Sequence, residues 1–197
     1  MWTKHILDDH EAELPEWGVA CSPLVVGPVV VVSPGGPKGR SLVAYDKKTG
    51  DVAWRGGDER MHWSSPVRVS LAGQEQILIF NAAGLASHEI GSGDVLWSYP
   101  WHSKHPHVAL PVVCSGNRVC ISSGYGAGCH LLQIEKKPDG VFSATTVWRS
   151  LRLKAKFANF LEHDGFVYGL DDGVLTCIDV ATGKRMWKRG RYGHGQL

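Results

Sequence analysis

The chain has 197 residues, of which 43% are hydrophobic and 20% are charged. Its 21 lysines and arginines exceed its 19 aspartates and glutamates by only two charges, and no basic stripe stands out, so nucleic acid is not an expected partner. No apolar run approaches the roughly 20 residues of a membrane helix, so no transmembrane segment is expected. The 24 glycines and eight tryptophans favour an all-β repeat over a helical bundle.

In chain order, residues 1–17 come first. They have the acids and the proline typical of a connection, and are expected to be the tail of a preceding repeat followed by a link. Four segments then follow, at approximately 18–55, 64–98, 108–149 and 156–188. Each has four short apolar stretches separated by turn residues, which predicts four strands. The first strand of the fourth segment is expected near residues 157–162.

Three of these segments contain one short motif: an apolar strand, an acidic residue, a Ser/Thr-Gly turn and a strand that ends in tryptophan. It reads LVAYDKKTGDVAW at 42–54, LASHEIGSGDVLW at 85–97 and LTCIDVATGKRMW at 175–187, with a looser copy that ends at Trp148. The repeated residues are Asp46, Thr49, Gly50, Trp54, Glu89, Ser92, Gly93, Trp97, Trp148, Asp179, Thr182, Gly183 and Trp187. Successive tryptophans lie 43, 51 and 39 residues apart, which fits a four-stranded propeller blade of ~40–50 residues.

Each residue type in the motif has a structural role. The acidic or threonine oxygen accepts backbone N–H bonds in a tight hairpin, and glycine supplies the positive φ. The tryptophan is a large plate that can pack between neighbouring blades. Trp2 lies 52 residues before Trp54 and is predicted to be the last tryptophan of a preceding blade. The motif residues are therefore assigned to folding rather than to chemistry.

The segments AYDKKTGDVAW and CIDVATGKRMW resemble the AxDxxTGxxxW motif of the PQQ-like (pyrroloquinoline quinone-like) β-propellers. That family includes quinoprotein dehydrogenases, the BamB-like scaffold of the outer-membrane β-barrel assembly machinery, and bacterial PQQ-binding-like repeat proteins. The resemblance covers nearly the whole chain and implies an all-β fold, a quinoprotein alcohol dehydrogenase-like propeller of four-stranded antiparallel blades. It also implies a periplasmic or other extracytoplasmic location.

Family members usually have seven or eight blades, so about four blades are expected to form an incomplete ring. Its first and last blades would then expose apolar faces, and the missing blades of the same propeller would be its partners. The favoured function is a non-catalytic scaffold that binds a protein partner, with no catalytic residue and no cofactor expected.

Two alternatives stay open. The first is a fragment of a PQQ-dependent dehydrogenase. For such an enzyme the resemblance implies adjacent disulfide-bonded cysteines, a calcium ion and a catalytic aspartate. The five cysteines are nowhere adjacent, and no acidic set matches a calcium site; small buried cysteines are the favoured interpretation. The cysteines are Cys21, Cys114, Cys120, Cys129 and Cys177.

The second alternative is a metal-assisted enzyme at His102, His105 and His107, since three imidazoles in one loop could hold a zinc-type ion with an open position. The competing interpretation is a solvated loop. The acidic pair Asp171-Asp172, followed by glycine, is interpreted as a turn between two strands.

Overall fold

Short strands make up nearly all of the regular structure between residues 1 and 196, the part of the chain that the computed structural model describes. One 3-10 turn, η1 (Asp8–His10), precedes them. The strands form four antiparallel sheets of four strands, and each sheet keeps its strands in chain order. No helix within this described range is long and apolar enough to cross a membrane.

Each sheet is a simple meander, which we call a blade. Blade one consists of β1 (Leu24–Val26), β2 (Val29–Val32), β3 (Leu42–Asp46) and β4 (Val52–Gly56). Blade two consists of β5 (Val67–Leu71), β6 (Gln74–Phe80), β7 (Gly84–Glu89) and β8 (Val95–Pro100). Blade three consists of β9 (Val112–Cys114), β10 (Arg118–Ser123), β11 (Gly128–Lys136) and β12 (Phe142–Ser150). Blade four consists of β13 (Leu161–His163), β14 (Phe166–Asp171), β15 (Val174–Asp179) and β16 (Arg185–Arg191).

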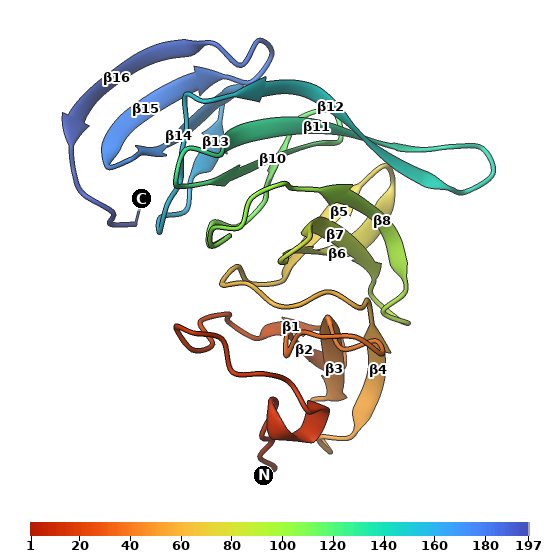
Figure 1. Ribbon diagram of the computed structural model, residues 1–197. Helices are drawn as coiled ribbons and strands as arrows, with labels where there is room; N and C mark the ends of the chain where they lie inside the picture. The colour runs from red at the N-terminus through yellow and green to blue at the C-terminus, as the bar shows by residue number, and fades with distance from the viewer. Residues whose placement is uncertain (197) are drawn as a thin grey trace.

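The four blades follow one another along an arc that does not close (Figure 1). The first strands of neighbouring blades contact each other, as β1 contacts β5 and β9 contacts β13. The hairpin of β11 and β12 is the longest and projects outward from the arc (Figure 1). The architecture confirms the predicted all-β propeller of four-stranded antiparallel blades in an open ring.

The hydrophobic core lies between blades rather than within them, because a single sheet cannot bury both of its faces. Between blades one and two, Leu42 and Trp54 pack against Ile77 and Ile79. A larger cluster joins blades two and three, with three aromatic side chains from β8 and its extension, namely Trp97, Tyr99 and Trp101. A third cluster joins blades three and four and contains three of the cysteines, namely Cys114, Cys120 and Cys129.

One contact between neighbouring blades recurs along the arc. The Trp54 indole donates to the backbone oxygen of Ile90, 2.9 Å away, and Trp148 donates to the backbone oxygen of Val180 at 2.8 Å. Each acceptor lies three residues before the glycine of the next blade's Thr/Ser-Gly turn, and the indole covers that glycine. A β-carbon added at Gly93 would lie 2.4 Å from the Trp54 ring. The repeated tryptophan and the repeated glycine are therefore two halves of one contact between blades.

Trp2 repeats this contact on the first blade. Its indole donates to the backbone oxygen of Lys47 at 3.1 Å and covers Gly50. Trp97 departs from the rule and donates instead to the Gln76 side chain at 2.9 Å within its own blade. The reason lies in blade three, where the long β11–β12 hairpin replaces the short turn that would accept the indole.

The segment before blade one covers that blade's outer face. Trp2 and Ile6 pack against Tyr45, which is only 2% exposed, and the His10 ring lies 2.6 Å (Nε2 to Oη) from the Tyr45 hydroxyl. The expectation that the first blade exposes an apolar face is therefore wrong. Residues 1–17 were predicted to be the tail of a preceding blade followed by a connection, and burial of Tyr45 and its neighbours brings the start of this segment onto the sheet of blade one.

The acidic residue of the repeat caps its hairpin as predicted. Asp46 Oδ1 accepts the backbone N–H groups of Lys48 and Thr49 at 2.7 and 3.0 Å, and Asp179 Oδ1 accepts that of Thr182 at 2.7 Å. These backbone donors lower the pKa of Asp46 because they stabilise its charged form. The Asp46 carboxylate therefore stabilises the turn.

The first strand of blade four begins later than expected. β13 starts at Leu161, while residues 151–160 form an irregular loop. Its apolar side chains, among them Leu153, Ala155 and Phe160, fill the space between blades three and four. The apolar run that predicted a strand from residue 157 is thus a core-filling loop, and apolar content alone does not distinguish the two.

Candidate functional site

The blades present two different ends. Because neighbouring strands run antiparallel, the connections after the second and fourth strands of every blade lie at one end, which we call the loop face. The Thr/Ser-Gly turns lie at the other end, which we call the turn face. In blades three and four the loop face therefore carries residues 101–111, 123–128, 151–160, 172–173 and 190–196.

The three predicted histidines lie in one of these loops but do not converge. His107 is fully buried, stacks on Phe80 with ring centroids 4.4 Å apart, and donates from Nδ1 to the Asn81 backbone oxygen at 2.7 Å. His105 is exposed and stacks on Tyr125 at 4.7 Å. His102 is exposed. Within residues 1–196, no group of three or more His, Cys, Asp or Glu side chains is placed to hold a metal ion.

His107 has a different histidine as its neighbour. The ring of His62, from the loop between blades one and two, lies 4.4 Å from the His107 ring, and His62 Nδ1 accepts the backbone N–H of His107 at 3.2 Å. Burial, followed by the nearby His107 and Arg60, lowers the pKa of His62 to about 4. Burial also lowers the pKa of His107. Both rings are neutral at pH 7 and connect adjacent loops, so the interpretation of a solvated loop is wrong for His107.

A hollow of ≈ 360 Å³ lies near the axis, where the first strands of all four blades begin. Hydrogen bonds tie its rim: Ser22 donates its backbone N–H to Ser65 Oγ at 2.8 Å, and Leu110 donates to Asn159 Oδ1 at 2.9 Å. The described residues that line the hollow include no carboxylate, lysine or arginine. Such a lining does not fit a tricarboxylate quinone paired with calcium, which needs cationic groups and carboxylate ligands.

The tryptophans of the repeat serve contacts between blades. One ring face of Trp54 and one of Trp148 pack against the turn glycine of the next blade. The cysteines are all free thiols, and those at 114, 120, 129 and 177 are buried. Burial raises the pKa of Cys114 to about 11, followed by smaller charge effects, and burial raises that of Cys129 to about 12. Such thiols are unreactive near neutral pH.

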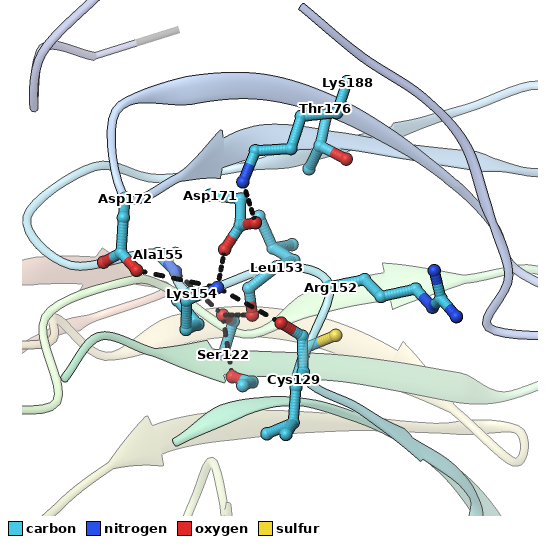
Figure 2. Close-up of polar contacts among 12 residues, drawn as sticks. Ser122, Cys129, Arg152, Leu153, Lys154, Ala155, Asp171, Asp172, Thr176 and Lys188 are labelled. Atoms are coloured by element: carbon cyan, nitrogen blue, oxygen red, sulfur yellow. Dashed lines mark hydrogen bonds and ion pairs between the residues drawn. The ribbon is translucent and has the colours of Figure 1, made fainter. Parts of the chain in front are cut away.

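A buried ion cluster anchors the loop between blades three and four (Figure 2). Asp171, at the end of β14 and 2% exposed, pairs with Lys154 from the loop and with Lys188 from β16. The partly exposed Asp172 lies 3.5 Å from Lys154. Asp172 and the glycine after it form the predicted turn, but the sequence did not indicate that Asp171 turns inward to bind two lysines.

Ser122 holds the same loop from the other side. Its hydroxyl accepts the backbone N–H of Ala155 at 3.0 Å and donates to the backbone oxygen of Leu153 at 3.1 Å (Figure 2). Residues 153–155 are thus fixed both by Asp171 and by Ser122. The side chains that follow them in the loop project from a rigid base.

Those side chains belong to a row of rings on the loop face, which we call the aromatic strip and which consists of His105, Tyr125, Phe157 and His194. Ring centroids are 4.7 Å apart between the first two, 6.3 Å between the middle two and 5.7 Å between the last two. Tyr125 and Phe157 are 40% and 42% exposed. The ammonium of Lys156 lies 4.5 Å from the Tyr125 centroid and 5.2 Å from that of Phe157.

Sequence reasoning missed this strip. Its four rings come from three loops and from the segment after β16, at positions that share no period. The one available signal was the tyrosine inside the glycine-rich stretch SGYGAG, where a flexible hairpin needs no aromatic residue.

Comparisons with known proteins find matches to a family model and to solved structures. A family model described as outer membrane protein assembly factor BamB matches residues 10–189. A search of curated proteins found no match. Among solved structures, BamB from Moraxella catarrhalis is similar with a TM-score of 0.58 and 20% identity, over 91% of this chain and 52% of that chain. The computationally designed Ika8 protein gives 0.42 and 13%, over 91% and 65%. The chain thus spans about half the length of the BamB structure.

Proposed function

The chain belongs to the BamB family of PQQ-like β-propellers, and on that premise we propose that it is a non-catalytic scaffold that binds a protein partner in the bacterial cell envelope. The family model names an outer membrane protein assembly factor, and the match extends over nearly all of the chain. The proposed role is to hold such a partner during assembly, with the location in the envelope carried over as part of the proposal.

One observation carries the non-catalytic part of the proposal. The polar and aromatic residues that repeat along the chain are occupied in folding: Asp46 and Asp179 cap turns, and Trp54 and Trp148 lock neighbouring blades. A catalytic group needs a reactive atom near a substrate site, whereas these side chains serve turns and contacts between blades. The loop face carries the longer connections between and within the blades, and loops on a rigid scaffold are where binding residues concentrate.

A quinone-dependent dehydrogenase is the competing function, and a titration separates the two. PQQ with calcium is added to the purified chain while tryptophan fluorescence and dye-linked alcohol oxidation are followed. The scaffold proposal expects neither saturable quenching nor turnover. Saturable quenching together with oxidation would overturn it.

Binding itself is tested by crosslinking. The tagged chain is expressed in the cells that make it, treated with a membrane-permeant crosslinker and purified under denaturing conditions. One envelope protein is expected to be attached reproducibly, and its share should not increase when the chain is destabilised by the Gly93→Ala substitution described below. Attachment to many unrelated proteins in equal amounts, or to none, would contradict the proposal.

A further inference from the structure

The loop face of blades three and four combines exposed rings with positive charge. Residues 101–111, 123–128, 151–160 and 190–196 contain no aspartate or glutamate, whereas they contain five lysines and arginines. The five are Lys104, Arg152, Lys154, Lys156 and Arg191. Two carboxylates belong to the same face: Asp171 ends β14 and Asp172 lies in the β14–β15 connection, and both are within ion-pair distance of Lys154. Because Asp171 and Asp172 pair with Lys154, and Asp171 also pairs with Lys188, the charges that remain around the aromatic strip are positive, although the whole chain is nearly neutral.

The backbone of Tyr125 adopts an unfavourable conformation. Tyr125 has φ 56°, in the left-handed region where glycine and asparagine are at ease and a bulky residue is an outlier. It is the only aromatic residue with a positive φ between residues 1 and 196. Outliers of this kind persist where the surroundings impose them, and they cluster at binding sites. A glycine at 125 would form the hairpin more easily, so the ring is present for a reason other than the turn.

The neighbours of Tyr125 are arranged to display it. A β-carbon at Gly124 would lie 2.7 Å from the Lys156 side chain, so the absence of a side chain there lets Lys156 lie across Tyr125. Phe157 follows Lys156 in the anchored loop and reaches the rim of the axial hollow. The C-terminal segment is tied to the same loop, since Gln196 accepts from the Asn159 backbone N–H and donates to the Phe157 backbone oxygen.

We infer that the aromatic strip binds an extended, acidic segment of a partner protein, with a large apolar side chain of that segment placed between Tyr125 and Phe157. The rings supply apolar contact area at low entropic cost, and the lysines select negative charge. A protein segment is favoured over a nucleic acid because the family is one of assembly factors. This inference rests on the proposed scaffold function and specifies the chemistry of the partner.

The direct test uses a short fluorescein-labelled peptide in which aspartate alternates with phenylalanine, followed by fluorescence anisotropy. Saturable binding is expected, weaker by about tenfold or more when lysine replaces the aspartate or serine replaces the phenylalanine. Added salt should also weaken it, because Lys104 is exposed and Lys156 keeps partial contact with solvent. Tighter binding of a labelled oligothymidylate than of the acidic peptide would overturn the inference.

Matched variants locate the site. The double substitution Lys104→Met/Lys156→Met removes two charges and keeps the packing of the lysine stem against Gly124. Tyr125→Asn removes the ring and suits the left-handed backbone. Each is expected to weaken binding of the acidic peptide about tenfold. The control Lys137→Met/Lys184→Met removes the same charge from the turn face and should leave the affinity within about twofold.

The acidic-peptide site and the scaffold function are overturned by different results. Equal losses in the strip and control variants, or no binding of the acidic peptide to the native chain, overturn the aromatic strip as an acidic-peptide site. If the envelope crosslinks described above are still found, the scaffold function stands and its surface lies elsewhere. If the crosslinks are also absent, both the acidic-peptide site and the scaffold function are overturned.

Discussion

The indole of Trp54 covers Gly93 of the next blade so closely that the glycine hydrogen faces the ring, with room for nothing larger. The same indole donates to a backbone oxygen of that blade's turn. A propeller blade is thus joined to its neighbour by a large tryptophan ring that packs on a glycine without a side chain. This relationship makes the repeat motif a folding device and leads to the first prediction.

Gly93→Ala is expected to lower the free energy of unfolding by about 2–4 kcal/mol, since it adds overpacking to a left-handed backbone at φ +80°. Urea denaturation followed by circular dichroism measures the loss. The matched control is Gly73→Ala, where φ is +76° and nothing lies within 4 Å of the new β-carbon. The control should cost only about 1–2 kcal/mol. Equal losses would show that Trp54 does not press on Gly93.

Asp171→Asn is expected to cost about 2–3 kcal/mol. Removing the charge leaves Lys154 and Lys188 near each other in a largely buried setting, and the usual 3–5 kcal/mol for a broken buried pair is reduced because both lysines keep some contact with water. Asp172→Asn is the control, since Asp172 is half exposed and 3.5 Å from Lys154. It should cost at most about 1 kcal/mol. The midpoint of thermal unfolding of both variants checks the ranking, and a reversed order would contradict the anchor role of Asp171.

Acid is expected to destabilise the chain from near pH 6.5 downward. His62 has its pKa lowered to about 4 in the folded protein, chiefly by burial, so the unfolded chain binds a proton between pH 6.5 and about 4 that the folded chain rejects. Stability from His62 is therefore complete above pH 6.5 and declines as the pH falls to about 4. His62→Asn keeps an acceptor for the His107 N–H and should make this decline shallower, as measured by urea unfolding at several pH values. His163→Asn, at an exposed position, should leave the slope unchanged.

Tyr125→Asn is expected to leave the free energy of unfolding unchanged or to raise it by up to about 1 kcal/mol, because asparagine accepts φ 56° more readily than tyrosine does. The same variant should lose binding to the acidic peptide. A gain in stability paired with a loss in binding identifies a residue kept for function. A loss of more than about 2 kcal/mol would instead make Tyr125 a structural residue.

Much of the fold was predictable because the fold repeats. The spacing of Trp54 and Trp97, and the Asp-to-Thr-Gly turn, occur several times in phase, so each copy supports the others. The exceptions depend on single contacts that no period shows. The Trp97 indole donates to Gln76 because the next blade lacks the short turn that would accept it. His107 is buried because it stacks on Phe80 and donates to the Asn81 backbone oxygen.

The candidate surface could not be predicted for a related reason. Tyr125, Phe157 and His194 meet only because blades three and four bring their loops to one face, and loops carry no hydrophobic period. The contact of Trp2 with blade one follows the predicted tryptophan repeat, whereas the packing of Ile6 on the same face was missed because that segment has no strand patterning. Sequence reasoning recovered the contacts that repeat and missed those formed once.

The most direct test of a scaffold that binds its partner through the loop face is photocrosslinking that distinguishes the two faces. A photoreactive amino acid is placed at Tyr125 on the loop face or at Lys48, an exposed turn-face residue of blade one, and the cells are irradiated. The account predicts a single envelope protein crosslinked from position 125, with a yield at least about tenfold above that from position 48. Equal yields from the two positions, or a partner found only from position 48, would contradict it.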